Sequence, residues 1–421
     1  MSGCWDTLEP AMRTCIELGP VPAFSPLGLQ GQEVFLYRRL GDQRRAVLGV
    51  GMISHASEPV FNDEGRVSDW TFGHAGYDLK EELHGLRSPH KSESGLPMSH
   101  WFVPRWVMEW REELGFLHAL PGDEMEARAF ADRLLNAAPH ASTGAQLVWR
   151  SRTSRDRYLD RAARLMQHIQ RGDIYEVNYC VERTATDWGF DPFGAFARLL
   201  AASDAPFAGF YRMHDRFALC ASPERFLSFQ GLRVKGEPMK GTRPRGVDPV
   251  EDERLRNELA TDAKERSENI MAVDVMRNDL SQIATADSVR VEELCAVRSY
   301  PRVHQLVSTI TAEMGAGRSP YDVVRASFPM ASMTGAPKHS AMQLIDSMEE
   351  QRRGLYSGTL GFFAPDGTAD LNVVIRTVLF DAATGYLSLS TGSALTAQCD
   401  PEKEWEECEV KARSVIDSLA P

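Results

Sequence analysis

Three apolar runs near the C-terminus, "SGTLGFFAP" (residues 357–365), "DLNVVIRTVLF" (370–380) and "GYLSLSTG" (385–392), are followed by "DPEKEWEECEVKARSVIDSL" (400–419). Gly, Asp and Pro separate the runs, which favours strands joined by turns. The last stretch predicts a helix, because Asp400 is a good N-cap residue and Pro401 fits the first helical position. Strands mixed irregularly with helices, without a regular strand–helix alternation, indicate an α+β fold.

The rest of the chain has the same mixed character. Short runs such as "EVFLYRR" and "HWFVP" predict strands in the first 120 residues or so, followed by a helix that ends at Pro139. "TSRDRYLDRAARLMQHIQRGD" (153–173) predicts an amphipathic helix between a Ser154 cap and Gly172. "IYEVNYCVERTA" (174–185) predicts a strand with Tyr175, Val177, Tyr179 and Val181 on one side, and one long helical stretch is expected from about residue 250 to 280.

A linker candidate, "HASTGAQ" (140–146), divides the chain. We therefore expect an N-terminal lobe at residues 1–140 and a second, larger region at 150–421. The length of 421 residues is consistent with two lobes, or with one large domain that carries an N-terminal extension.

Composition excludes several classes of function. Hydrophobic residues make up 43% and charged residues 25%, as in ordinary globular proteins. With 59 acidic and 47 basic residues, the net charge of -12 implies no nucleic-acid partner. No apolar run is long enough to span a membrane, and the charged N-terminus is unlike a signal peptide. Seven cysteines without a C-x-x-C pair indicate reduced thiols, so we expect a cytoplasmic location.

A cationic stretch, "EPMKGTRPRG" (237–246), contains Lys240, Arg243 and Arg245, and Lys235 lies just before it. Neighbouring guanidinium groups and burial would both lower the pKa of Lys240, and a neutral lysine is a nucleophile. The same pattern is also typical of a cationic loop that binds an anion or faces water. From spacing alone, both interpretations stay open.

Two carboxylate pairs have the spacing that places both side chains on one helix face: Glu265 with Glu268, and Glu404 with Glu407. If the two pairs met, their oxygens would suit Mg²⁺. Each pair alone is also typical of a solvated helix face. The sequence carries no Walker loop, no H-E-x-x-H motif and no complete dinucleotide fingerprint.

Taken together, "GDIYEVNY", "SPERFL", "PMKGTRPRG", "ERSENIMAVDVMRNDLSQIA", "TGAPKHSAMQLID", "NVVIRT" and "DPEKEWEECEVKA" resemble the motifs of the chorismate-utilising enzymes. Within that family the chain is most similar to the aminodeoxychorismate (para-aminobenzoate) synthase component I group. The resemblance is dense from about Arg155 onward and makes 150–421 the chorismate-binding catalytic region. It implies two antiparallel sheets packed as a β-sandwich with helices outside and the active site between them.

The resemblance also implies roles for individual residues. Lys240 would be the nucleophile that attacks the chorismate ring, and Glu224 the general acid. Glu268 and Glu407 would bind Mg²⁺, with Glu265 and Glu404 nearby or acting through water. The expected substrate contacts are Gly241, Thr242, Ser332, Tyr356, Arg376, Gly392 and Lys411.

The implied reaction is Mg²⁺-dependent amination of chorismate at C4 to 4-amino-4-deoxychorismate, a step toward para-aminobenzoate and folate. The ammonia would come from a separate glutamine amidotransferase subunit, because this chain shows no nucleophile signature of such an enzyme. The alternatives are anthranilate synthase component I, then isochorismate or salicylate synthase, then a non-catalytic chorismate-binding protein.

Three departures from the family pattern point away from anthranilate synthase. Gln305 replaces the His of H-L-V-S, and His304, one residue earlier, would point elsewhere on a strand. Ala394 replaces a glycine in the loop that would take the substrate's carboxylate. The L-L-E-S motif of the tryptophan-inhibited enzymes is absent.

Overall fold

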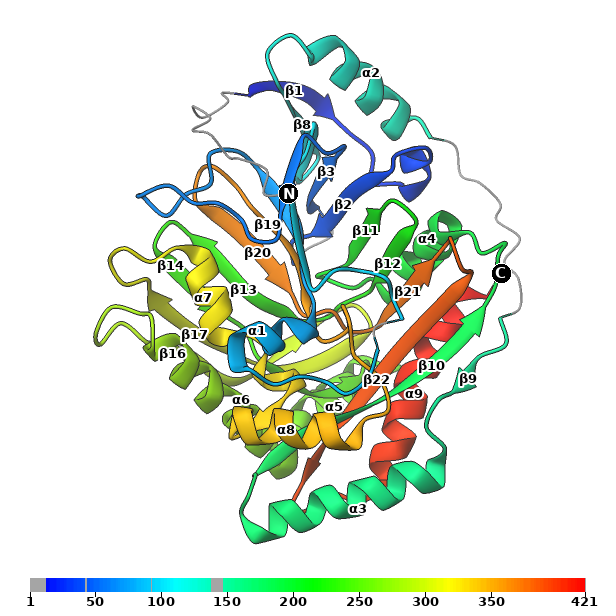
Figure 1. The fold of residues 1–421 in the computed structure, drawn as a ribbon, viewed down its shortest axis with the longest axis vertical. Coiled ribbons are helices and arrows are strands. Elements are labelled where there is room, and N and C mark those ends of the chain that lie inside the picture. The colour runs from blue at the N-terminus through cyan, green and yellow to red at the C-terminus, as the bar shows by residue number, and fades with distance from the viewer. Residues whose placement is uncertain (1–12, 42–43, 92, 138–146, 421) are drawn as a thin grey trace.

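The computed structural model describes residues 13–41, 44–91, 93–137 and 147–420. In these residues two antiparallel sheets pack face to face, and helices cover the outer sides (Figure 1). Apolar side chains from both sheets, such as Leu36 and Leu379 from one and Phe72 and Leu360 from the other, form the core between them. The α+β β-sandwich expected from the sequence is thereby confirmed.

The larger sheet has 12 strands within the described residues. In spatial order they are β1 (Thr14–Pro20), β8 (Leu114–Ala119), β7 (Trp106–Arg111), β3 (Arg45–Val50), β2 (Val34–Arg39), β11 (Gly209–Met213), β12 (Arg216–Cys220), β21 (Thr377–Asp381), β22 (Tyr386–Thr396), β10 (Glu176–Thr186) and β18 (Gly335–Ala336), with β9 (Arg150–Ser151) paired to β10.

The smaller sheet has 10 strands within the same residues. In spatial order they are β15 (Met239–Pro244), β17 (Val303–Glu313), β14 (Arg233–Gly236), β13 (Arg225–Gln230), β20 (Thr368–Asn372), β19 (Thr359–Phe363), β5 (Thr71–Ala75), β6 (Ser99–Val103) and β4 (Ser54–Ala56), with β16 (Arg290–Ser299) paired to β17.

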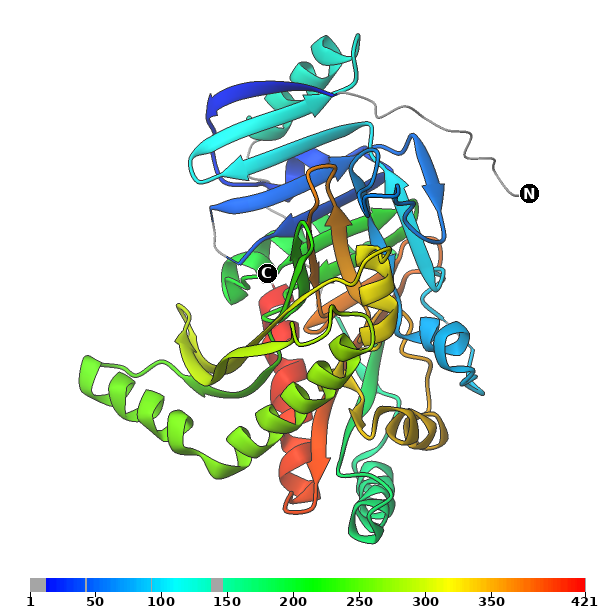
Figure 2. The same cartoon turned by 90° about the vertical axis from the view of Figure 1, so that its left-hand side faces the viewer.

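Helices pack on the outer face of each sheet. The α-helices are α1 (Lys80–His84), α2 (Glu124–Leu135), α3 (Arg155–Arg171), α4 (Pro192–Ser203), α5 (Pro249–Thr261), α6 (Ala263–Ser281), α7 (Pro320–Ser327), α8 (Lys338–Met348) and α9 (Pro401–Leu419), and the short 3-10 helices are η1 (Pro26–Leu29), η2 (Tyr77–Leu79) and η3 (Ala331–Met333). The helices α3, α4 and α9 contact the larger sheet, and α5 and α6 contact the smaller one. Figure 2 shows α5 and α6 as a bent pair that projects from the side of the molecule.

Strands from the first 120 residues complete both sheets. In the larger sheet β2 pairs with β11, and in the smaller sheet β5 pairs with β19. The predicted N-terminal lobe therefore shares its hydrogen-bonded sheets with the catalytic region. The linker candidate at 140–146 lies outside the described residues, and the division at 140/150 stays a prediction.

Two predicted helices begin where their N-cap residues place them, and the first of them also ends at its predicted glycine. Ser154 accepts a hydrogen bond from the Arg157 amide at the start of α3, and Gly172 ends that helix with a φ of 83°. Asp400 accepts from the Glu402 amide at the start of α9, with Pro401 in its first turn. Of the four residues expected on one side of the next strand, Val177, Tyr179 and Val181 are buried in β10, whereas Tyr175 lies just before the strand and is 63% exposed.

The expectation of one helix over 250–280 was also wrong, because the chain breaks at Asp262. The Asp262 side chain accepts hydrogen bonds from the amides of Lys264 and Glu265, so it caps a new helix, α6. A capping aspartate competes with continuation of the previous helix. As a result α5 and α6 meet at a bend, and Glu265 lies in the first turn of α6.

The stretch "DLNVVIRTVLF" is not one strand, since β20 belongs to the smaller sheet and β21 to the larger. Residues 373–376 cross between the sheets beside a second crossing, residues 221–224, which joins β12 to β13. The Val373 amide donates to the Glu224 carbonyl, and the Ala221 amide donates to the Arg376 carbonyl. Glu224 and Arg376 thus lie on adjacent crossings, where the two sheets come together.

No helix among the described residues is long and apolar enough to cross a membrane.

Candidate active site

One cavity of about 470 Å³ contains every candidate site residue. Its walls come from both sheet crossings, from β10, β15, β17 and β22, and from helices α6 and α9. The candidates that line it are Glu224, Lys240, Gly241, Thr242, Glu265, Glu268, Ser332, Tyr356, Arg376, Gly392, Glu404, Glu407 and Lys411. The structure therefore brings the two carboxylate pairs and Lys240, far apart in sequence, to one place.

Glu224 is a buried carboxyl group with a strongly shifted pKa. Its side chain accepts a hydrogen bond of 2.7 Å from the Ser332 hydroxyl. Burial raises the pKa of Glu224 to about 7, although Ser332 and the charge of Lys240 act in the opposite direction. A carboxyl group with a pKa near the working pH can donate a proton to a leaving group, which is what general-acid catalysis requires.

Lys240 enters the cavity from a bulge in β15. The register between β15 and β17 shifts at Gly241, whose φ is 83°. The backbone conformation at Gly241 favours glycine, and a Cβ there would also lie only 3.0 Å from the Glu265 side chain. The Lys240 ammonium donates a 2.5 Å hydrogen bond to the Glu176 carboxylate.

The expectation that guanidinium groups would lower the pKa of Lys240 was wrong. Burial does lower it, but the carboxylates of Glu176, Glu268 and Glu224 outweigh burial and raise the pKa above its ordinary value. In this structure Lys240 is therefore a protonated cation among carboxylates.

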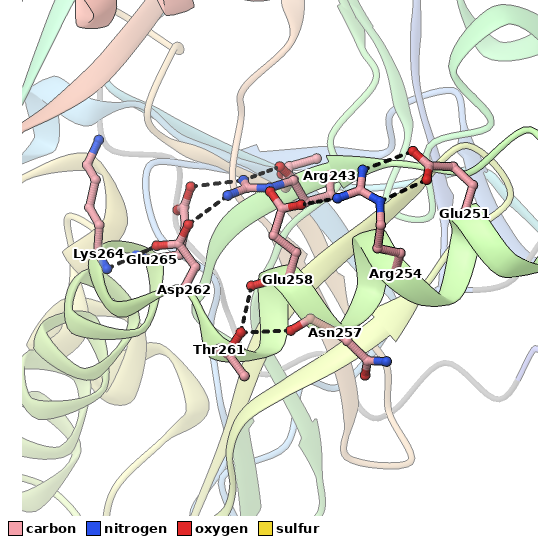
Figure 3. A network of polar contacts seen from close by, with 10 residues as sticks. Arg243, Glu251, Arg254, Asn257, Glu258, Thr261, Asp262, Lys264 and Glu265 are labelled. Atoms are coloured by element: carbon pink, nitrogen blue, oxygen red, sulfur yellow. Dashed lines mark hydrogen bonds and ion pairs between the residues drawn. The ribbon is translucent and has the colours of Figure 1, made fainter.

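The two arginines of the cationic stretch point away from Lys240. Figure 3 shows Arg243 at the α5–α6 bend, where its guanidinium contacts Glu258, Asp262 and Glu265. Arg245 pairs with Asp252 in α5. These ion pairs hold β15 against both helices.

The acidic residues of α6 and α9 are partly neutralised by lysines. The Lys264 ammonium lies 2.9 Å from Glu404 and 3.7 Å from Glu268, and Lys411 lies 2.5 Å from Glu407. Among the described residues, no three His, Cys, Asp or Glu side chains come close enough together to hold a metal ion.

The same carboxylates fit Mg²⁺ in chemical kind. Oε1 of Glu268 is buried without a hydrogen-bond partner, and burial raises the pKa of that carboxyl to about 7. A hard divalent cation prefers such oxygen donors and would compensate their charge. The predicted metal ligands are thus in one cavity, with lysine ammonium groups beside them.

Other candidate residues present polar groups to the cavity. Arg376 has a φ of 53°, and its guanidinium donates to the Ser414 hydroxyl but forms no ion pair with any described residue. Gly392 packs so tightly that a Cβ would lie 2.4 Å from Asn178 Oδ1, and its carbonyl accepts a hydrogen bond from Lys411. A guanidinium without an ion-pair partner among the described residues, in the same cavity as exposed backbone, is suited to binding a carboxylate.

Gln305 lines the cavity, is 4% exposed, and its Oε1 has no hydrogen-bond partner. The neighbouring His304 points to the other face of β17, as its position on the strand predicted, and contacts Ser299 and Asp252. Ala394 also lines the cavity, so its methyl group occupies part of the wall.

Sequence reasoning missed two residues that shape the site. Glu176 is a buried carboxylate at the start of β10, and Lys264 lies beside the acidic residues of both helices. Glu176 was recognisable as the one acid inside a largely apolar run, "IYEVNYCV" (174–181). Lys264 gave no signal, because a lysine in the first turn of a helix usually faces water.

Comparison with known proteins identifies the family of this chain. The family model described as chorismate binding enzyme matches residues 43–417. Aminodeoxychorismate synthase component 1 of Escherichia coli K12 is 34% identical over 86% of this chain and 79% of its own length. Anthranilate synthase component 1 of Thermus thermophilus is 35% identical over 82% of this chain and 76% of its own. Aminodeoxychorismate synthase of Streptomyces griseus is 40% identical over 82% of this chain, which spans about half of that protein (49%).

Solved structures agree on the fold. MenF, the menaquinone-specific isochorismate synthase of Escherichia coli, superposes with a TM-score of 0.76 at 19% identity, covering 98% of this chain and 96% of its own. Anthranilate synthase component I of Streptococcus pneumoniae gives 0.73 at 21% identity, covering 99% and 95%. With the family model matching most of its length, this chain belongs to the chorismate-binding enzyme family.

Proposed function

We propose that this chain aminates chorismate at C4, giving 4-amino-4-deoxychorismate, as its aminodeoxychorismate synthase relatives are named to do. The observation that carries the proposal is Lys240, a lysine that lines the same cavity as the buried acid Glu224. A lysine nucleophile and a protonated carboxyl group are the two groups that displacement of a ring hydroxyl needs.

In the proposed reaction, the neutral amine of Lys240 adds to C2 of the ring. Its lone pair forms the N–C2 bond, the two conjugated ring double bonds each shift by one position toward C4, and the C4–O bond breaks. Glu224 gives its proton to the departing hydroxyl, which leaves as water. Ammonia then adds at C4, the N–C2 bond breaks, and the proton released by the new amine returns to Glu224.

We assign Mg²⁺ to Glu268 and Glu407, with Glu265 and Glu404 nearby or acting through water. When bound, the ion would supply the positive charge that holds the ring carboxylate of chorismate. Arg376, Lys411 and the backbone at Gly392 would take the second carboxylate. Thr242, Ser332 and Tyr356 would orient the ring, and Ser332 also holds Glu224 through the 2.7 Å hydrogen bond.

Changing Glu268 to Gln should raise the Mg²⁺ concentration that gives half-maximal activity by about tenfold or more, because it removes one negative charge from the cation site. Mg²⁺ titration by calorimetry, without substrate, checks the same change. Glu406→Gln is the matched control, since Glu406 lies on the same helix, is exposed and does not line the cavity. Full wild-type activity in excess chelator would remove the metal from the proposal.

We further propose that a glutamine amidotransferase subunit supplies the ammonia and that the product leads to para-aminobenzoate and folate. The component 1 names of the relatives support a partner component. We place the reaction in the cytoplasm. The described cysteines, all of them free thiols, are consistent with a reducing compartment.

The second candidate is anthranilate synthase component I, the name that the Thermus thermophilus relative carries. Gln305 argues against it, because an amide does not titrate near neutral pH and cannot help to remove a ring proton. The test is chromatography of the product made from chorismate, Mg²⁺ and an ammonium salt, with the ammonium omitted as the control.

A further inference from the structure

The lysine assigned as the nucleophile has a single acidic partner within hydrogen-bond distance. Its ammonium donates to Oε1 of Glu176 over 2.5 Å, and Glu176 forms no other side-chain ion pair among the described residues. The side chains of Lys240 and Glu176 are 10% and 5% exposed. The two residues are 64 positions apart, on β15 of the smaller sheet and β10 of the larger.

Other charges surround this pair without contacting it. Glu268 from α6, Glu224 from the crossing before β13, and Glu407 from α9 all act on Lys240 through space. Gln305 from β17 is neutral, and Arg243 on the same strand pairs with the α5–α6 bend. Within the described residues, Glu176 is thus the one carboxylate in position to exchange a proton directly with the Lys240 amine.

We propose that Glu176 is a catalytic proton acceptor: its carboxylate takes the proton from Lys240 when chorismate fills the cavity, and so produces the neutral amine. This inference rests on the proposed function. The Nζ–H bond of Lys240 breaks, its electron pair stays on nitrogen, and the proton moves to Oε1 of Glu176. After ammonia has displaced the lysine from the ring, the proton returns to Nζ, and nothing is oxidised or reduced.

Burial supplies the driving force for this transfer. A buried ion pair loses the hydration of both charges, whereas the neutral amine and carboxylic acid do not need it. In the cavity without substrate, the neighbouring carboxylates keep Lys240 charged. A substrate that fills the cavity and removes the remaining solvent favours moving the proton across the short hydrogen bond, because desolvation disfavours both charged forms.

The first test measures the amine without turnover. Trace acetic anhydride acetylates only neutral amines, and mass spectrometry of peptides gives the rate at each lysine. At a fixed pH of about 8, Lys240 should be acetylated about tenfold or more faster in Glu176→Gln than in wild type. The reason is that loss of an adjacent carboxylate lowers a lysine pKa by about one unit or more. Since labelling needs no substrate, its result holds whatever product the chain makes.

Asp279→Asn is the matched control. Asp279 and Lys338 form another buried pair, with 2.6 Å between nitrogen and oxygen, and neither residue lines the cavity. This variant should speed acetylation of Lys338 and leave that of Lys240 unchanged. If Lys240 in Glu176→Gln were acetylated at the same rate as in wild type, the proposal would be overturned.

The second test uses turnover with ammonium at a series of pH values. Without an internal acceptor, Lys240 must lose its proton to solvent, so the Glu176→Gln rate divided by the wild-type rate should rise with pH. Taking the ratio cancels the titration of ammonium and of Glu224. A ratio that is low but constant would mean a structural role and would contradict the proposal.

Glu176→Asp provides the conservative comparison, because it keeps a carboxylate on a side chain shorter by one methylene. Its turnover should exceed that of Glu176→Gln, and its ratio to wild type should stay flat with pH. If Glu176→Gln does not fold, Glu176→Asp still decides the question: a ratio for Glu176→Asp that rises steeply with pH would contradict the role of the carboxylate.

Discussion

Replacing Lys240 with alanine is expected to lower the formation of 4-amino-4-deoxychorismate by roughly a thousandfold or more, because the reaction loses its nucleophile. The assay uses an ammonium salt as the nitrogen source, so that no partner subunit is involved. Near-ultraviolet circular dichroism should show an intact fold. The variant leaves Glu176 buried without its partner, so some stability should be lost, and the double variant with Glu176→Gln should recover it.

The variant Lys240→Arg distinguishes the role of Lys240 as a nucleophile from the role of its positive charge. An arginine keeps the positive charge and can still donate a hydrogen bond to Glu176, but a guanidinium does not lose its proton in a protein. Lys240→Arg should therefore be about as inactive as Lys240→Ala. If Lys240→Arg retained activity, or if Lys240→Ala turned over at the wild-type rate, the covalent role of Lys240 would be wrong.

Replacing Glu224 with glutamine is expected to lower kcat/KM for chorismate by about 10²–10⁴, the usual contribution of a positioned general acid. The amide keeps the shape of the side chain, and its oxygen can accept the hydrogen bond from Ser332. It has no proton to give to the departing hydroxyl. Steady-state rates with ammonium give the comparison, and an unchanged kcat/KM would remove Glu224 from the role of acid.

The same variant should gain stability at high pH. Burial raises the pKa of Glu224 from 4.5 to about 7, so the folded protein favours the protonated form. The unfolded chain ionises first as the pH rises, and folded wild type therefore loses stability between these two values and stays penalised above them. The quantity compared is the unfolding free energy of Glu224→Gln minus that of wild type. This difference should be larger at a pH of about 8 than at a pH of about 5, by about 2 kcal/mol. Denaturant unfolding of both proteins at both pH values measures this quantity. If it were the same at both pH values, the pKa of Glu224 would not be raised in the folded protein.

Local signals in the sequence predicted local structure well. The starts of α3 and α9 follow from Ser154 and Asp400, because an N-cap satisfies backbone amides two or three residues away. The helix break at Asp262 was missed although the same residue type marks it. The residues before and after Asp262 both mix apolar and charged side chains, so together they looked like one continuous helix. The bend between the two helices is stabilised by Arg243 from a distant strand.

Long-range contacts explain what the sequence could not supply. The run 370–380 looked like one strand, since nothing within it shows that Asn372 and Thr377 belong to different sheets. The surroundings of Lys240 were misjudged for the same reason. Its sequence neighbours Arg243 and Arg245 turn toward α5 and α6, whereas its pKa is raised by distant carboxylates, among them Glu176, 64 positions away.

The central claim, amination without loss of the enolpyruvyl group, is tested most directly by one incubation of the purified chain with chorismate, Mg²⁺ and ammonium. Pyruvate release and the fluorescence of ortho-aminobenzoate are followed together while chorismate is consumed. We expect chorismate to disappear with neither signal, and para-aminobenzoate and pyruvate to appear only after a separate lyase is added. Prompt pyruvate in equal amount to ortho-aminobenzoate would instead make this chain an anthranilate synthase and contradict the account.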